Sequence, residues 1–111
     1  MPVCYLYTSA DIRRALTDVA DYIDGHLVKG AYARDEKGRP VSANHPNVSG
    51  LDVHGAVERL VPGHMRHECL RRIRKSVKRH EESCSISRYS DRPEITGSDV
   101  AKIVRLAEHE K

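Results

Sequence analysis

Apolar residues recur every three or four positions along several parts of the chain, and this spacing predicts helices that bury one face. The clearest case is residues 8–25, where Thr8 and Asp11 match a capping box at the start, although Ser9 could also be the cap. Gly25 is suited to end this helix in a left-handed conformation. The apolar stripe of this helix consists of Ile12, Leu16, Val19, Ala20, Ile23 and Leu27.

Two more helices are predicted in the middle of the chain. A polar loop over residues 42–50 precedes them, and Ser49 with Asp52 matches a second capping box. The helix that starts there ends at the Pro-Gly pair of residues 62–63, because both residues interrupt helices. The next helix covers residues 64–82 and is strongly basic.

The pattern changes to alternation over residues 28–41, which is typical of a β-strand. Residues 35–38 have the composition of a turn, and Gly38 suits the positive φ of a bulged hairpin loop. These features predict a short β-hairpin over residues 28–41, with Tyr32 as a core anchor beneath it. Residues 1–8 would either join the hairpin as a third strand or form an arm.

The last part of the chain is predicted to be irregular or extended over residues 83–95. A final helix then begins at Thr96 or Ser98, with Asp99 as the partner in a capping pattern. Together, the predicted elements describe a single α+β domain over residues 1–111, dominated by about four helices and containing one short β-hairpin.

Composition narrows the class of protein further. The 111 residues suffice for one modest core, which must be aliphatic because the chain has no Trp, no Phe and only five Tyr. No apolar run approaches the roughly 20 residues that cross a bilayer, and the first residues lack the basic segment of a signal peptide. Three cysteines without framework spacing fit a reducing compartment. We therefore expect a cytoplasmic protein without membrane insertion.

Three segments of the chain carry a resemblance to a known family. Residues 30–41 read Gly-Ala-Tyr-Ala-Arg-Asp-Glu-Lys-Gly-Arg-Pro-Val, which fits the family hairpin Gly-x-Tyr-x-x-Asp-x-x-Gly-x-Pro. Residues 51–56 (Leu-Asp-Val-His-Gly-Ala) stand where the family has Trp-Cys-x-x-Gly-Ala. Residues 89–91 (Tyr-Ser-Asp) stand where it has Trp-Asn-Asp. With these motifs, the chain resembles a small family of unknown function found in actinobacteria and their phages.

The resemblance covers about residues 12–107 and implies a phage or actinobacterial setting. It implies no activity, because the family has none assigned. Any site that the family builds on its Trp, Cys and Asn would be altered in this chain.

Positive charge is concentrated in the helix predicted over residues 64–82. The net charge of the chain is +3, but residues 64–80 carry seven Lys or Arg against one Glu, a local charge of +6. On a helical projection the basic residues lie opposite an apolar arc that includes Leu70, Ile73 and Val77. The helix is therefore expected to expose a continuous basic stripe. The basic stripe consists of Arg71, Arg72, Arg74, Lys75, Lys78 and Arg79.

The basic stripe admits several interpretations. It would bind an acidic protein, the phosphates of nucleic acid or an anionic membrane surface, or it is a solvated face balanced by aspartates of the first helix. No aromatic residue lies in the stripe to stack on bases, and no Asn or Gln lies among its arginines to read bases. Binding to nucleic acid would therefore be nonspecific.

Metal binding and catalysis find less support in the sequence. Cys69 and His80 are roughly 16 Å apart along one helix, too far to share a zinc ion. His64 and His67 face the basic side, away from the cysteines. A glycine-rich phosphate loop, a nucleophile elbow and a sheltered pair of carboxylates are all missing from the sequence. We expect no metal, no cofactor and no catalytic residue.

These observations predict a small accessory protein that acts by binding a macromolecule. The leading partner is a host protein, with the chain as an adaptor or inhibitor. Nonspecific binding of nucleic acid through residues 64–82 is the alternative, and an enzyme of unknown reaction is the third interpretation.

Overall fold

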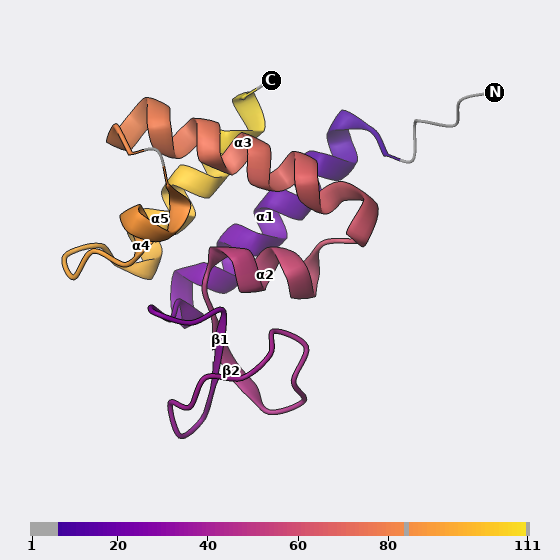
Figure 1. Ribbon diagram of the computed structural model, residues 1–111. Helices are drawn as coiled ribbons and strands as arrows, with labels where there is room; N and C mark the ends of the chain where they lie inside the picture. The colour runs from indigo at the N-terminus through magenta and orange to yellow at the C-terminus, as the bar shows by residue number, and fades with distance from the viewer. Residues whose placement is uncertain (1–6, 84, 111) are drawn as a thin grey trace.

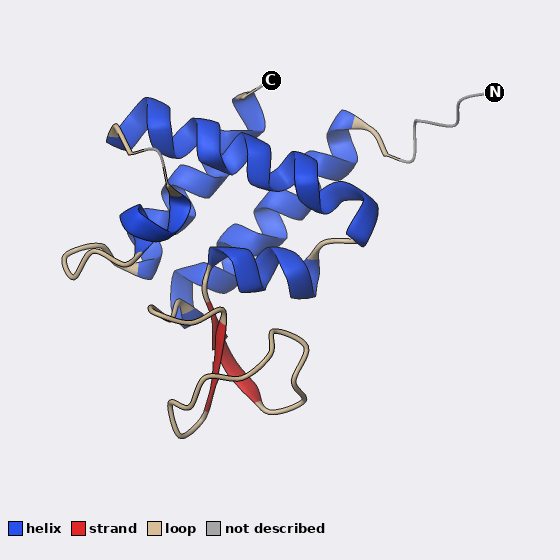
Figure 2. Cartoon of the chain, viewed as in Figure 1, coloured by secondary structure: helices blue, strands red, loops and turns tan. Residues whose placement is uncertain are grey.

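The computed structural model describes residues 7–83 and 85–110, which form a helical body with a small sheet at one end (Figure 1). Figure 2 shows the helices packed together and the two short strands beyond α2. The α+β class and the dominance of helices are confirmed. In chain order the elements are α1 (Ser9–His26), β1 (Ala33–Asp35), β2 (Val48–Leu51), α2 (Val53–Leu60), α3 (Gly63–Glu81), α4 (Ile86–Ser90), α5 (Gly97–Leu106) and the 3-10 turn η1 (Ala107–His109).

Capping boxes begin the first and last α-helices, and the caps are Thr8 and Thr96, not the alternatives Ser9 and Ser98. At α1, the Asp11 amide donates to the Thr8 hydroxyl at 3.2 Å, and the Thr8 amide donates to the Asp11 carboxylate at 2.9 Å. At α5, Thr96 and Asp99 form the same reciprocal pair with the same two distances. Each box satisfies amides that would otherwise lack partners in the first turn of the helix.

The end of α1 differs from the prediction. Gly25 was expected to end the helix in a left-handed conformation, but the helix continues to His26 and Gly25 does not have a positive φ. The chain leaves the helix at Leu27, which is extended. The next amide, of Val28, donates to the Leu51 carbonyl at 3.2 Å. Pairing with the sheet therefore ends α1 without a left-handed glycine.

The core lies between α1, α5 and α3, which packs across the other two (Figure 1). α5 approaches α1 so closely that a Cβ at Gly97 would lie 2.4 Å from the Ile23 carbonyl oxygen. The buried Ser76 hydroxyl of α3 donates to the Ile103 carbonyl of α5 at 2.7 Å, so this buried polar group is satisfied. The largest fully buried side chains are mainly aliphatic, and they include Tyr89, Ile12, Leu16, Ile23, Leu51 and Ile73.

The turn predicted at residues 35–38 is confirmed. The Asp35 carboxylate accepts hydrogen bonds from the amides of Lys37 and Arg39, both at 2.9 Å. Gly38 has a φ of +78°, the positive value expected for it. These contacts, with the Gly38 amide donating to the Asp35 carbonyl at 2.9 Å, close the loop locally.

The strand pairing, however, extends beyond the hairpin predicted over residues 28–41. The return segment makes a single bridge, between Arg34 and Pro40. The partner strand of β1 is instead β2, antiparallel, with Ala33 opposite Leu51. β2 lies where the sequence predicted the end of a polar loop and the start of a helix. The polar loop is therefore shorter than expected, and it joins two paired strands.

Two further boundaries needed correction. Ser49 does not cap α2, because it lies in β2; the cap is Asp52, whose carboxylate accepts from the Gly55 amide at 2.7 Å. Residues 83–95 were expected to be irregular, yet they contain α4. Ser85 caps this helix by accepting from the Arg88 amide at 3.2 Å. Five residues are too few for a recognisable apolar period, which is why the sequence did not reveal α4.

The predicted strand or arm at residues 1–8 lies mostly outside the described residues. Tyr7 packs partly buried against the core, and its ring lies 6.1 Å from that of His64. Within residues 7–83 and 85–110, every helix is too short or too polar to cross a membrane.

Candidate functional site

Three arginines of the basic stripe are held by carboxylates of the same chain. Arg71 donates through Nε and Nη2 to both oxygens of Glu68, at 2.8 and 2.7 Å. Arg72 donates through Nε to the same carboxylate at 2.7 Å. Hydrogen bonds from Arg71, and then from Arg72, lower the pKa of Glu68 to about 2. They outweigh burial, which by itself would raise this pKa. This carboxylate therefore stays charged under ordinary conditions.

Arg79 forms an ion pair near the C-terminal end of the described chain. Its Nε and Nη2 donate to the Glu110 carboxylate at 2.7 and 3.0 Å. Glu110 is only 4% exposed, and the hydrogen bond from Arg79 lowers its pKa. This ion pair joins the end of α3 to the segment after η1, so Arg79 has a structural contact as well as a place in the stripe.

The rest of the basic stripe faces solvent. Arg74, Lys75 and Lys78 are all exposed. The side chains of Arg74 and Lys78 form no hydrogen bond or ion pair with the residues that the structure describes. One interpretation set the aspartates of α1 against the basic stripe. Two of them, Asp21 and Asp24, instead lie 2.9 and 3.6 Å from Arg105 of α5.

A different surface centres on Tyr32, which the sequence had assigned to the core. That interpretation is wrong, because Tyr32 is 55% exposed and stands out among the described residues as an exposed large hydrophobic side chain. Its ring is stacked on that of His54, with centroids 5.7 Å apart and planes 14° apart. A hollow of about 290 Å³ lies beside the two rings. We call its lining the Tyr32 face: Tyr32, His54, Val57, Glu58, Arg66 and Leu70.

Backbone contacts between the loop and α2 place Tyr32 on the surface. The Asp52 amide donates to the Tyr32 carbonyl at 3.0 Å. A Cβ at Gly55 would lie only 2.0 Å from that carbonyl oxygen, so the loop approaches α2 this closely because position 55 is glycine. His54 precedes this glycine, and its ring faces the same loop because it stacks on Tyr32. Its Nδ1 is buried and has no partner among the described residues.

The three segments that carry the family resemblance meet at this place. The Gly30 amide lies 3.4 Å from an oxygen of Asp91, and the Asp52 amide binds the Tyr32 carbonyl. Burial raises the pKa of Asp52, and the charge of Asp91 raises it further. Residues 30–41, 51–56 and 89–91 are thus brought together around the base of the Tyr32 face, although they are widely separated in the sequence.

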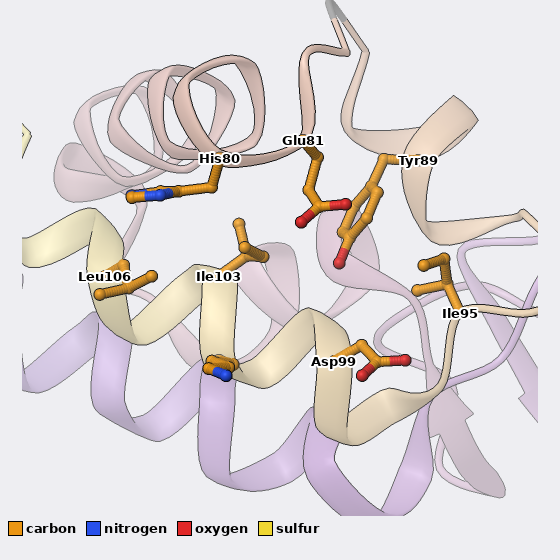
Figure 3. A pocket seen from close by; sticks show the side chains of 8 residues that line it. His80, Glu81, Tyr89, Ile95, Asp99, Ile103 and Leu106 are labelled. Atoms are coloured by element: carbon orange, nitrogen blue, oxygen red, sulfur yellow. The ribbon is translucent and has the colours of Figure 1, made fainter.

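A second hollow, of about 400 Å³, lies between α3, α4 and α5 (Figure 3). Tyr89, which is 1% exposed, extends from α4 toward α5, and Glu81 reaches toward it from the end of α3. Burial and the charges of Glu81 and Asp99 raise the pKa of Tyr89 to about 12, so its hydroxyl remains a donor. Ile103 and Ile95 supply an apolar wall. The hollow combines a hydroxyl, two carboxylates and aliphatic groups, and the irregular segment predicted over residues 83–95 gave no sign of it.

Candidate metal ligands do not converge in the part of the chain that the structure describes. His, Cys, Asp and Glu side chains there form no group of three suited to a metal ion. Cys69 is fully buried, and burial raises the pKa of its thiol to about 11, so it is not a ready thiolate. Cys4 and Cys84 lie outside the described residues.

Comparisons with known proteins give a family without an assigned role. No curated protein and no solved structure matches this chain. A family of unknown function, DUF6197, matches residues 8–110, which span every element from α1 to η1. This agrees with the expected membership of a family of unknown function. The chain therefore belongs to the DUF6197 family.

Proposed function

We propose that this protein acts by binding another protein through the Tyr32 face, without catalysing a reaction. The observation that carries the proposal is Tyr32 itself. Its ring is more than half exposed, yet its position is fixed by the stack on His54 and by the backbone contact with Asp52. An aromatic side chain held rigidly in solvent loses little conformational entropy on binding, which favours it as an anchor.

The chemistry around Tyr32 suits a protein interface. Tyr and Arg are enriched at the centres of such interfaces, and the Tyr32 face contains both. Val57 and Leu70 add an apolar floor to the hollow. Arg66 is held in place because its Nε donates to the Val61 carbonyl at 3.0 Å. The face thus offers an aromatic anchor, an apolar depression and a positioned cation.

Charge indicates the kind of partner. Arg74 is exposed one helical turn after Leu70 on α3, so the cationic surface continues from Arg66 past the hollow. The partner we propose has an apolar side chain for the hollow and carboxylates for Arg66 and Arg74. The family resemblance points to a phage or actinobacterial source. The partner is then a host protein in the cytoplasm, and the chain is an adaptor or an inhibitor.

A matched pair of variants tests this proposal. Immobilised wild-type protein is used to capture partners from host lysate, beside Tyr32→Ala and Tyr22→Ala. Tyr22 is the control because it also stacks on a histidine, His26, at 4.7 Å, but lies elsewhere on the molecule. We expect a discrete band that resists nuclease, disappears with Tyr32→Ala and persists with Tyr22→Ala. A band that survives Tyr32→Ala would remove the Tyr32 face from the interaction.

The exposed part of the basic stripe favours a second candidate, nonspecific binding of nucleic acid. Arg74 and Lys78 lie one turn apart without a carboxylate partner among the described residues, so both are available to phosphates. Fluorescence anisotropy with a short DNA duplex would test this with the double variant Arg74→Gln and Lys78→Gln. If each residue contacts a phosphate, the slope of log affinity against log salt should flatten by roughly two units. Recovery that is lost on nuclease treatment would also favour this candidate over a protein partner.

A further inference from the structure

A third hollow, of about 500 Å³, gathers arginine side chains from two helices. It lies where the start of α1, the middle of α3 and η1 come together. It shares no residue with the Tyr32 face or with the Tyr89 hollow of Figure 3. We call it the arginine hollow, and its lining is Ser9, Arg13, Arg71, Arg72, Glu108 and His109.

Glu68 positions two of the arginines without using all of their donors. It accepts from Nε and Nη2 of Arg71 and from Nε of Arg72, so the Nη1 groups of both have no hydrogen-bond partner among residues 7–83 and 85–110. Arg72 is 14% exposed and Arg71 is 33% exposed, which restricts both side chains further. Two guanidinium groups are therefore fixed in advance on one wall of the arginine hollow. Such preorganisation lowers the entropic cost of binding an anion.

Arg13 completes the arrangement from α1. It is exposed, and its guanidinium forms no ion pair with the residues that the structure describes. Glu108 lines the hollow, Glu68 contacts two of its arginines, and His109 Nε2 lies 3.4 Å from Glu108. Three arginines against two glutamates leave a net positive charge even when His109 is neutral.

We propose that the arginine hollow binds a phosphate monoester dianion. Arginine presents paired N–H groups that match phosphate oxygens, and a monoester has three terminal oxygens and close to two negative charges. Three guanidinium groups around one depression fit that shape. A phosphodiester backbone has one charge per phosphate and would require cations in a row, as in the exposed part of the basic stripe. The ligand is therefore a phosphorylated side chain or a small phosphorylated molecule.

Adjacent arginines of α1 provide a matched test. Amide chemical shifts of ¹⁵N-labelled full-length protein are followed during titration with phosphoserine, with inorganic phosphate and with a phosphoserine peptide. The variants are Arg13→Gln and Arg14→Gln. Arg14 is also exposed, but it lines a separate depression with Asp11 and Asp18. A single-stranded oligonucleotide without a terminal phosphate supplies the diester control.

We expect saturable shifts at Ser9, Arg71 and Arg72, with affinity about tenfold weaker in Arg13→Gln and unchanged in Arg14→Gln. Tighter binding of the peptide than of free phosphoserine would support the proposal and identify a protein source. Equal binding would support it with a small molecule as the source. The absence of saturable shifts, equal weakening by both substitutions, or tighter binding of the oligonucleotide would each overturn it. Both substitutions are on the surface, so a folded protein is expected in every arm.

Discussion

Two tyrosine–histidine pairs in this protein place the same kinds of side chain in different surroundings. Tyr22 and His26 lie one turn apart on α1, with ring centroids 4.7 Å apart, and His26 Nδ1 lies 3.1 Å from the Tyr22 carbonyl. Tyr22 is partly buried against the core, and burial raises the pKa of its hydroxyl. Its environment combines packing against the core with the contact to His26 on the same helix.

The second pair depends on contacts between separate elements. Tyr32 lies in the loop before β1, and His54 lies on α2. Tyr32 does not belong to the residues packed against the core, and the hydrogen bond from the Asp52 amide fixes its backbone instead. An exposed ring that is held by backbone contacts contributes little to folding and remains available to a partner. The contrast fits a structural role for Tyr22 and supports the proposed binding role of Tyr32.

Of the substitutions that test this comparison, one at the contact between α2 and the Tyr32 loop should change the free energy of unfolding most. Gly55→Ala places a Cβ 2.0 Å from the Tyr32 carbonyl oxygen, so the loop must separate from α2. We expect a loss of about 3 kcal/mol in the free energy of unfolding, measured by urea denaturation.

The matched control for that substitution is Gly25→Ala on α1. No atom lies within 4 Å of the Cβ that alanine would add there, and Gly25 has no positive φ. Alanine should therefore stabilise the helix by about 0.5–1 kcal/mol, through its higher helix propensity. A small effect of Gly55→Ala would mean that the loop does not need α2 to hold Tyr32.

Truncating the two tyrosines should separate stability from binding. Tyr22→Ala removes a ring that packs against the core, and we expect it to cost about 2 kcal/mol of folding free energy. Tyr32→Ala removes an exposed ring and should cost less than about 0.5 kcal/mol. Thermal unfolding of both variants measures the difference. Equal losses would show that Tyr32 is also structural, and the comparison between the pairs would fail.

The two histidines should respond in opposite ways to substitution by phenylalanine. His54→Phe keeps a ring for Tyr32 to stack on and removes a buried Nδ1 that has no partner among the described residues. We expect it to stabilise the fold by up to about 1 kcal/mol, because an unsatisfied buried polar atom is lost. His26→Phe instead removes the contact between Nδ1 and the Tyr22 carbonyl and should be neutral or slightly destabilising. A destabilising His54→Phe would indicate that Nδ1 has a partner in solution.

The sequence predicted the parts of the fold that depend on near neighbours. The capping boxes of Thr8 and Thr96 involve residues three positions apart, and the turn at Gly38 is closed by Asp35. The pairing of Ala33 with Leu51 joins residues that are distant in the chain, so periodicity within each segment did not reveal β2. Local pattern is informative where the stabilising contact is itself local.

The surface chemistry was harder to predict for the same reason. A helical projection placed Arg71, Arg74 and Arg79 on one stripe, but it could not show that Glu110, 31 positions from Arg79, would hold that arginine. Tyr32 was assigned to the core because it belongs to an alternating pattern. The signal against that assignment was Gly55, whose missing side chain allows the loop to approach α2. A glycine near the start of a helix suggests that another backbone segment approaches it closely, but it does not show which segment does so.

Asp52 has two contacts at this place: its amide holds the Tyr32 loop, and its carboxylate caps α2. Burial raises the pKa of this carboxylate above its ordinary value of 3.8, so the folded state binds a proton more readily than the unfolded state. Its contribution to stability is therefore fully present below that value and is lost as pH rises through the higher folded pKa.

Asp52→Asn keeps an oxygen to accept from the Gly55 amide and removes the buried charge. At pH 7 the variant should be more stable than the wild type by less than about 1 kcal/mol, and the advantage should disappear near pH 3. Denaturation curves at the two pH values measure this. A wild type that is the more stable of the two at pH 7 would show that the Asp52 charge is favourable where it lies, and that the Tyr32 loop is held partly by that charge.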